Sequence, residues 1–380
     1  MSKVLLGDVA VEHKETCKGS KDGYPIVGLE HLVPEEITLT AWDEGSENTF
    51  TKMFRKGNVL FGRRRAYLKK AAVAPFDGIC SGDITVIEAK PDRILPELLP
   101  FIIQNDALFD FAVGKSAGSL SPRVKWEHLK NFEFELPDMD KQKELAALLW
   151  AMDDTKKSYQ KLIAATDELV KSQFIEMFGK PGTDPYEWGL TTLGECCELN
   201  PRRPRVMKPD IDYSFVAMPS VSEDGRIDAS IERPYSEVCK GFTYFAENDV
   251  LFAKITPCME NGKGGVAKGL KNGAGFGSTE FHVLRPIKGT SDPYWLYIIT
   301  MFPKFRSDAE KVMTGTGGQR RVPITYLSEY RIALPPIELQ EQFADFVRQS
   351  DKSKFAALRS SNLNLWSSSV IQKQTKMAIK

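Results

Sequence analysis

Two stretches of the chain, 198 positions apart, share one pattern of apolar and polar residues. Residues 128–144 read HLKNFEFELPDMDKQKE, and residues 326–342 read YLSEYRIALPPIELQEQ. In both, apolar residues recur at alternate positions, a proline follows, and an acidic residue and a glutamine come next. Alternation at a period of two predicts a β-strand, and the spacing after the proline predicts an amphipathic helix. Each stretch is therefore expected to be a strand-to-helix junction.

The junctions belong to an internal duplication. Shifted by 198 positions, residues 123–149 align with residues 321–347 without a gap, and seven of these 27 pairs are identical, whereas ordinary composition would give roughly two by chance. Upstream matches keep the same order, for example LGDVAVEHK from Leu6 with LGECCELNP from Leu193. A period this long indicates two copies of one domain. The identical pairs are Arg123/Arg321, Val124/Val322, Leu129/Leu327, Leu136/Leu334, Pro137/Pro335, Gln142/Gln340 and Ala146/Ala344.

A long helix is expected after each junction. Asp140 to Phe178 contains no proline or glycine, and a helix of that length would span about 58 Å at 1.5 Å per residue. We expect the two helices to pack antiparallel, and the alternative is that each domain folds its own helix back. Steps of three and four predict a coiled-coil-like seam at Leu145, Leu148, Met152, Thr155, Tyr159, Leu162, Thr166, Leu169 and Gln173. The second helix, from about Glu338 to the C-terminus, carries Phe343, Phe346, Val347, Phe355, Leu358, Leu365 and Val370.

Short β-like runs such as DITVIEA, NVLFGR and EFHVLRP alternate with turns rich in Gly, Pro, Asn and Asp. This pattern favours compact α+β domains. We therefore expect two similar globular domains, residues 1–136 and 181–334, joined by two long antiparallel coiled-coil-like helices, residues 137–180 and 335–380.

The duplicated pattern resembles the specificity (S) subunit of Type I restriction–modification systems, over nearly the whole chain. The resemblance is carried by the junctions ELPDMDKQKELAALL and ALPPIELQEQFADFV, by their spacing, and by the LGD/LGE opening of each half. It implies that each globular part is a target-recognition domain for one half of a split double-stranded DNA target. It also implies that the helices act as a spacer on which DNA methyltransferase (M) subunits, two of them, and through them restriction/translocase (R) subunits dock. The halves share little loop sequence, so the target is expected to be asymmetric.

Composition adds three expectations. The formal net charge is zero, whereas a nucleic-acid binder that works alone is usually basic, so partner subunits are expected to supply phosphate contacts. The six cysteines form no C-x-x-C pair and the four histidines stand at no ligand spacing, which argues against zinc and for reduced thiols. No signal peptide or membrane-length apolar run is present, so a cytoplasmic location, away from membranes, is expected.

No catalytic motif is found: the sequence contains neither a P-loop nor the N-P-P-[YF] signature typical of adenine methyltransferases. We expect a non-catalytic targeting subunit of a methyltransferase/endonuclease complex, with no cofactor and no metal. One alternative is a divergent nuclease that uses Asp77 or Asp83 with Glu88 and Lys90. Another is a two-domain adaptor on a helical stalk that does not bind DNA; the arginine-rich loops and the split-repeat layout favour DNA instead.

Cations and amides in the domain loops are the candidate DNA contacts, because arginine can fork onto guanine, glutamine onto adenine, and lysine onto phosphate. Two sets, residues 116–123 and 314–321, occupy equivalent places in the two copies. The candidates are Arg63, Arg64, Arg65, Lys69, Lys115, Ser116, Arg123, Arg202, Arg203, Lys254, Lys263, Gln319, Arg320 and Arg321. The junction residues Pro137, Gln142, Pro335 and Gln340 are expected to serve subunit docking or the helix junction, and capping of the first turn is the alternative for the glutamines.

Overall fold

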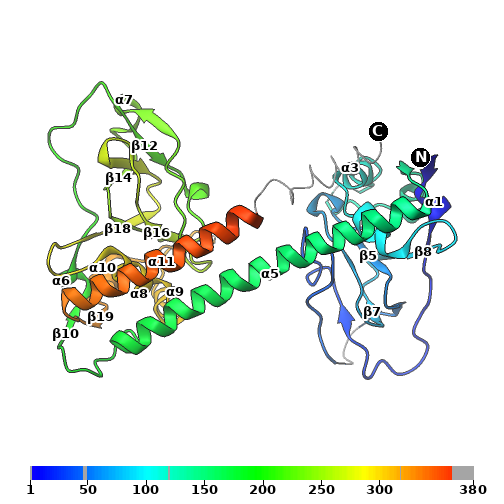
Figure 1. Ribbon diagram of the computed structural model, residues 1–380, viewed down its shortest axis with the longest axis horizontal. Helices are drawn as coiled ribbons and strands as arrows, with labels where there is room; N and C mark the ends of the chain where they lie inside the picture. Colours follow the sequence, from blue (N-terminus) through cyan, green and yellow to red (C-terminus); the bar gives the residue numbers. More distant parts are fainter. Residues whose placement is uncertain (1, 46–48, 119, 317, 362–380) are drawn as a thin grey trace. The chain divides into compact units, whose positions relative to one another are not determined.

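The computed structural model describes residues 2–45, 49–118, 120–316 and 318–361, although not the side chains of residues 353 and 355–361 (Figure 1). The chain divides into two compact units, one reaching from the N-terminal residues to Lys161 and the other formed by Leu162–Ala356. The long helix α5 (Met139–Phe178) contributes to both units, and α11 (Ile337–Ser361) follows the second junction. None of the described helices is both long and apolar enough to cross a lipid bilayer.

The first unit is built on a four-stranded sheet in the order β2-β8-β5-β6, a three-stranded sheet in the order β3-β7-β4, and the antiparallel pair β1-β9. Its strands are β1 (Ser2–Leu5), β2 (Ala10–Glu12), β3 (Ile26–Val27), β4 (Lys52–Phe54), β5 (Val59–Gly62), β6 (Ala71–Val73), β7 (Gly78–Cys80), β8 (Ile84–Ala89) and β9 (Glu133–Leu136). Its helices are α1 (Leu6–Val9), α2 (Leu99–Ile103), α3 (Asp106–Gly114) and α4 (Trp126–Leu129), with short 3-10 turns η1 (Ala66–Leu68) and η2 (Pro96–Leu98).

The second unit repeats this topology. Its sheets run β11-β18-β15-β16 and β13-β12-β17-β14, and β10 pairs with β19. The strands are β10 (Leu190–Thr192), β11 (Cys197–Leu199), β12 (Asp212–Val216), β13 (Glu232–Pro234), β14 (Thr243–Ala246), β15 (Val250–Ala253), β16 (Gly264–Val266), β17 (Ala274–Gly277), β18 (Phe281–Pro286) and β19 (Arg331–Ala333). The helices are α6 (Leu193–Cys196), α7 (Tyr235–Val238), α8 (Pro293–Met301), α9 (Pro303–Lys311) and α10 (Ile324–Glu329), with turns η3 (Met218–Ser220) and η4 (Lys271–Gly273).

The predicted α+β fold with an internal repeat is confirmed. The strand that follows each LGD/LGE opening, β2 or β11, forms the edge of a four-stranded sheet, and its neighbours follow in the same order. The second unit differs by one added strand, β13, at the edge of its other sheet. Equal topology follows from the equal apolar pattern, because the pattern specifies which face of each strand is buried.

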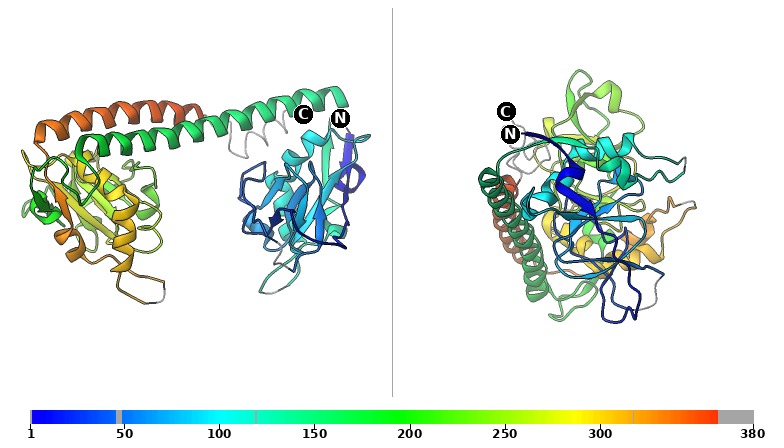
Figure 2. Two further views of the ribbon diagram at one scale, coloured as in Figure 1. Left: turned by 90° about the horizontal axis from the view of Figure 1, so that it is seen from below. Right: turned by 90° about the vertical axis from the view of Figure 1, so that its right-hand side faces the viewer.

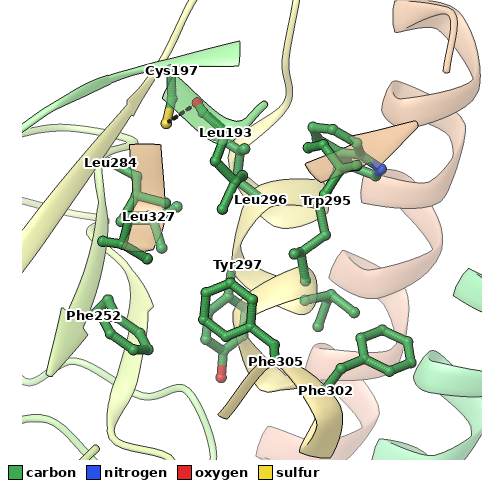
Figure 3. Close-up of a cluster of buried hydrophobic side chains, with 14 of the residues drawn as sticks. Leu193, Cys197, Phe252, Leu284, Trp295, Leu296, Tyr297, Phe302, Phe305 and Leu327 are labelled. Carbon is green, nitrogen blue, oxygen red and sulfur yellow. Dashed lines mark hydrogen bonds between the residues drawn. The ribbon is translucent and has the colours of Figure 1, made fainter. Parts of the chain in front are cut away.

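The core of the second unit lies between its main sheet and the helices that cover it (Figure 3). Phe252 from β15 and Leu284 from β18 meet Trp295 and Leu296 from α8, and all four are fully buried. Helix α8 begins at Pro293, where the Asp292 carboxylate accepts a hydrogen bond from the Tyr294 amide at 2.7 Å. A proline at the first helical position preceded by such a cap is a strong helix start.

The first turns of α5 are anchored in the first unit. The Asp138 carboxylate accepts a hydrogen bond from the Lys141 amide at 3.0 Å and so caps the helix. Leu145 and Leu149 are buried in the core of the first unit, and the Trp150 indole donates to the carbonyl of Glu97 at 2.9 Å. The helix predicted to begin at Asp140 therefore begins at Met139 and continues to the predicted end, Phe178.

The last turns of α5 belong to the second unit and lie beside α11 (Figures 1 and 2). The Phe343 ring packs edge-on against Phe174 and Phe178, with centroids 5.5 and 5.3 Å apart. At the other end of the contact, the Lys354 ammonium pairs with Asp167 at 2.6 Å. Since higher numbers on one helix meet lower numbers on the other, these parts of the two helices are antiparallel.

The predicted seam is wrong for three of its leucines. Leu148, Leu162 and Leu169 are 48, 49 and 53 % exposed, whereas the row Val170, Phe174, Phe178 is buried. The heptad argument assumed one partner helix along the whole length. Helix α5 instead buries its first turns in one core and its last turns in another, so its buried face is set by the cores. Of the predicted apolar positions of the second helix, Leu365 and Val370 lie outside the described residues, as do the side chains of Phe355 and Leu358.

Candidate nucleic-acid interface

Residues 117–123, which we call loop A, follow α3 in the first unit, and backbone hydrogen bonds join the two ends of the loop on either side of Ser119, which lies outside the described residues. Ala117 and Arg123 exchange both amide-to-carbonyl bonds, at 3.0 and 2.9 Å. The Arg65 amide donates to the carbonyl of Pro122 at 2.8 Å, and the Val124 amide donates to that of Arg63 at 3.0 Å. The returning end of loop A is thus tied to the segment that follows β5.

Side chains close loop A a second time. The Arg123 guanidinium donates through Nε to Asp83 Oδ1 at 2.7 Å and through Nη2 to Asp83 Oδ2 at 3.3 Å. Arg64 donates to Ser121 Oγ at 2.6 Å and to Asp83 Oδ2 at 3.4 Å. The hydrogen bond from Arg123 holds the pKa of the Asp83 carboxyl below its ordinary value. Asp83 therefore stays ionised and joins two arginines at the base of the loop.

Residues 314–321, which we call loop B, are closed in the same way in the second unit. Thr314 and Arg321 exchange backbone hydrogen bonds at 3.0 and 2.7 Å, and the Thr256 amide donates to the carbonyl of Arg320 at 3.0 Å. The Arg321 guanidinium donates to both Glu280 oxygens, through Nε at 2.9 Å and through Nη2 at 2.8 Å. This contact lowers the pKa of Glu280.

The acids of these two pairs occupy corresponding positions in the two domains, and neither ion pair is predicted from the sequence. Asp83 stands directly before β8, and Glu280 stands directly before the equivalent strand, β18. The sequence predicts for Asp83 only a possible metal-binding role, and it predicts no role for Glu280. The signal was present: Arg123 and Arg321 are identical in the aligned copies, and each acid precedes a matched strand.

Several predicted DNA contacts are free of ion pairs within the described residues. Arg65 and Arg202 are exposed, and so is the side chain of Gln319 in loop B. Arg63 and Lys254 are partly buried at equivalent positions after β5 and β15, and burial lowers the pKa of Lys254. Two further candidates lie where loop A leaves α3: Lys115 has its ammonium 5.8 Å from the centre of the Phe111 ring, and Ser116 Oγ donates to the carbonyl of Ala112 at 2.8 Å.

Other predicted contacts are occupied elsewhere. Lys69 pairs with Asp106 at 2.5 Å, at the start of α3. Arg203 donates to the Tyr235 hydroxyl at 2.9 Å and to a backbone carbonyl, and the Lys263 ammonium lies 3.5 Å from the carbonyl of Met218. Arg320 lies 3.5 Å from Glu310 and 3.9 Å from Glu260. The structure thus gathers part of the candidate list at the two loops and separates the rest.

A buried histidine supports the base of loop B. His282 of β18 donates from Nε2 to the carbonyl of Val322 at 2.9 Å, next to Arg321, and its Nδ1 faces the Asn200 amide at 3.2 Å. Burial lowers the pKa of His282 to about 4, so the ring is neutral at pH 7. The equivalent position in the first unit is Thr85, which is also buried.

The junction glutamines are buried and bind the backbone of their own domains. Gln142 accepts from the Leu95 amide at 2.8 Å and donates to the carbonyl of Pro137 at 2.9 Å. Gln340 accepts from the Asp292 amide at 3.0 Å and donates to the carbonyls of Thr290 and Pro335, at 3.0 and 2.9 Å. Their amides therefore tie each helix to its globular part, are not offered to a docking partner, and do not cap the helices that carry them.

The acidic residues proposed for a nuclease are engaged in other contacts. Glu88 pairs with His13 at 2.7 Å, Asp77 with Arg55 at 2.9 Å, and Lys90 donates to the carbonyl of Gly7 at 2.7 Å. With Asp83 held by arginines, these groups form separate ion pairs and not one constellation.

Among the described residues, one group of three possible metal ligands is close enough to share an ion: Glu30, His31 and Asp43. The Nδ1 atom of His31 accepts a hydrogen bond from the Gly28 amide at 3.0 Å. In the neutral ring, Nε2 then carries the proton and faces Asp43 at 3.5 Å as a donor. This arrangement suits a histidine–aspartate pair better than a metal ion.

Comparison with known proteins identifies the family. The model of the Type I restriction modification DNA specificity domain matches the chain twice, over residues 4–165 and 185–364. The chain belongs to this family. Loop A lies in the first specificity domain and loop B in the second, so the repeated loop geometry coincides with the repeated family match.

Two relatives from Escherichia coli are named as Type I restriction enzyme specificity subunits. The EcoEI subunit is 42 % identical over 159 residues, which are 41 % of this chain and 26 % of that protein. The EcoAI subunit is 39 % identical over 165 residues, which are 43 % of this chain and 28 % of that protein. Each match thus spans little more than a quarter of the relative's length. The crystal structure of a Type I restriction-modification system S subunit from M. genitalium has a TM-score of 0.53 at 12 % identity and covers 98 % of this chain and 94 % of that one, which is a likeness of fold.

Proposed function

We propose that this chain is the DNA-recognition subunit of a Type I restriction–modification complex and that each specificity domain reads one half of a split target. The observation that carries the proposal is the pair of loops A and B. Both are closed by the same backbone exchange and the same arginine–carboxylate pair, in two domains of one chain. A loop anchored at its ends and flanked by cations is suited to the major groove, where base edges are read by arginine and glutamine.

The two loops differ in sequence, which supports an asymmetric target. Loop A reads AGSLSPR and loop B reads TGTGGQRR. Exposed groups near loop A include Arg65 and Lys115, whereas loop B itself presents Gln319. Because arginine prefers guanine and glutamine prefers adenine, the two half-sites are expected to have different bases.

The chain is proposed to work with methyltransferase subunits, two of them, and through them with restriction subunits, in the cytoplasm. Its net charge of zero supports this, because a chain with no excess positive charge gains little affinity from the DNA backbone alone. The partners would supply both the chemistry and most of the phosphate contacts. We assign no catalytic residue to this chain, and we propose the boundaries 1–136, 137–180, 181–334 and 335–380 for its two recognition domains and two spacer helices.

The proposal is tested by mapping methylated bases across a host genome. The methyltransferase subunits encoded with this chain are expressed with and without it. We expect methylation of one two-part motif that disappears when the chain is omitted. If methylation were unaffected by the chain, or fell on a motif without two parts, the proposal would be wrong, and the adaptor alternative would gain support.

Variants in one domain then assign the half-sites. The pair Arg63→Ala and Arg65→Ala is expected to relax the motif at one half, and Gln319→Ala at the other, with each lost bidentate base contact costing about 1–3 kcal/mol. Matched controls are Arg93→Ala and Lys288→Ala, because both side chains are exposed and follow β8 and β18, at the ends opposite Asp83 and Glu280. Loss at both half-sites from a single-domain variant would contradict the assignment of one domain to each half.

A further inference from the structure

Arg123 and Arg321 were expected to touch DNA, yet both are committed to carboxylates. Each donates hydrogen bonds from Nε and one Nη atom to the two oxygens of one acid. A guanidinium can use this same edge to bind a guanine. The acids are well enclosed, since the side chains of Asp83 and Glu280 are 22 and 24 % exposed. To contact a base through this edge, each arginine would first have to leave a bidentate ion pair.

The duplication provides a second, independent argument. Copies that read different half-sites are expected to differ in the residues that touch bases and to agree in the residues that hold the framework. The aligned identical pairs behave as framework: Val124 and Val322 are 1 % exposed, and Gln142 and Gln340 are buried and bonded to their domains. The arginine belongs to this identical set, whereas the remaining loop residues differ.

We propose that Arg123 and Arg321 are positioning residues that latch loops A and B through Asp83 and Glu280, and that neither reads a base. The inference rests on the proposed DNA-recognition function and deepens it. In each domain the latch joins the returning end of the loop to the residue before a central strand, β8 or β18, which is buried in the main sheet. Loop orientation is thereby coupled to an internal, buried strand of the main sheet. The residues inside each loop can differ without loss of that orientation.

Neutralising the acid distinguishes a latch from a contact by the sign of the effect. In Asp83→Asn the arginine is untouched. If Arg123 contacted DNA, the change would free it and remove a negative charge near the phosphates, so DNA binding would stay the same or tighten. If Arg123 is a latch, loop A loses its anchor, and we expect affinity for the full target to fall roughly tenfold, the size of one lost base contact.

A double-mutant cycle provides the second criterion. Asp83→Asn and Arg123→Ala are measured alone and together in the assembled complex, with DNA that carries the intact target. A latch predicts that the double variant binds about as weakly as Asp83→Asn alone, because both changes break the Arg123 pair and Asp83→Asn also removes the acceptor of Arg64. A direct contact predicts that the Arg123→Ala loss appears in full on either background. Glu280→Gln with Arg321→Ala repeats the test in the second domain.

The readouts separate this role from general damage. Each pair of variants should relax the methylated motif at one half-site only and leave the slope of affinity against salt unchanged, since no phosphate contact is lost. Asp77→Asn, which breaks the exposed pair with Arg55 in the first unit, is the matched control and should leave the motif intact. Tighter binding by Asp83→Asn, or independent losses in the cycle, would overturn the latch. If the unaltered chain directed no split motif at all, the proposed function would fail, and the latch with it.

Discussion

Replacing Phe174 by alanine tests whether the cores set the buried face of α5. The Phe174 side chain is 2 % exposed, and its ring packs against Phe178, Phe302 and Phe343 with centroids 5.0 to 5.5 Å apart. These three partners come from α5 itself, from the loop between α8 and α9, and from α11. One ring therefore joins three segments of the second unit.

The expected cost follows from this burial. Truncation of a buried phenylalanine costs about 3–5 kcal/mol through lost transfer energy and the cavity that remains. For a unit of this size, 1 kcal/mol lowers the unfolding temperature by about 2–4 °C. A loss of about 4 kcal/mol therefore lowers the transition of Leu162–Ala356 by about 8–16 °C. The transition of the first unit, in which Phe174 takes no part, should not move.

Leu169→Ala is the matched control, because Leu169 lies on the same helix but is 53 % exposed. Exposed substitutions usually change stability by less than about 0.5 kcal/mol, and alanine favours the helix. Differential scanning calorimetry or urea unfolding of the purified chain measures both variants. A Leu169→Ala loss equal to that of Phe174→Ala would show that the heptad seam, and not the core-facing row, holds the helix.

Three further outcomes are expected. Gln340→Ala should lower the unfolding free energy of the second unit by roughly 1–3 kcal/mol, since it leaves the partly buried Asp292 amide without its acceptor; a change below 0.5 kcal/mol in urea unfolding would contradict this. His282 binds a proton near pH 6.5 in the unfolded state but only near pH 4 in the folded state, so the second unit should lose up to about 3 kcal/mol of unfolding free energy as the pH falls across that window. His282→Thr, which copies the Thr85 position, should abolish this pH dependence. If the pH dependence persisted, His282 would be ruled out as its source. Four residues inserted after Ala165, where α5 is buried in neither core, lengthen the helix by roughly 6 Å. The gap between the two parts of the methylated motif should then grow by about one or two base pairs. An unchanged gap in an active variant would exclude α5 as the spacer.

The framework could be predicted because it depends on local patterns. Helix α5 begins at Met139, one residue before the predicted start. This prediction was accurate because the sequence shows both the absence of helix breakers and the prolines and glycines that flank the helix. The duplication was visible for the same reason: buried positions repeat in kind, as Leu145 and Phe343 or Leu149 and Val347 illustrate.

The site was harder to predict because its contacts are long-range. Arg123 and Asp83 are 40 positions apart, and Arg321 and Glu280 are 41 positions apart. From the sequence alone, an arginine in a loop is as consistent with a DNA contact as with an ion pair. Only the fold shows which acid lies beside it. The same limit affected the seam of α5, because a heptad count cannot tell which of several apolar rows meets a core.

Within each domain, a short segment with buried residues at intervals connects the loop to the helix that follows it. In the first unit, Arg123 is followed by buried Val124, by α4 with buried Leu129, by β9 paired with β1, and then by the junction at Pro137. In the second unit the same steps lead from Arg321 through α10 and β19 to α11. Fewer than twenty residues separate each latch from its helix, and each stretch between them carries its own buried anchor. The arginine–carboxylate pair and the buried glutamine bind the same domain, one at each end of this segment. If the proposed function holds, a loop that contacts DNA is therefore expected to keep its orientation relative to the first turns of the helix that follows it.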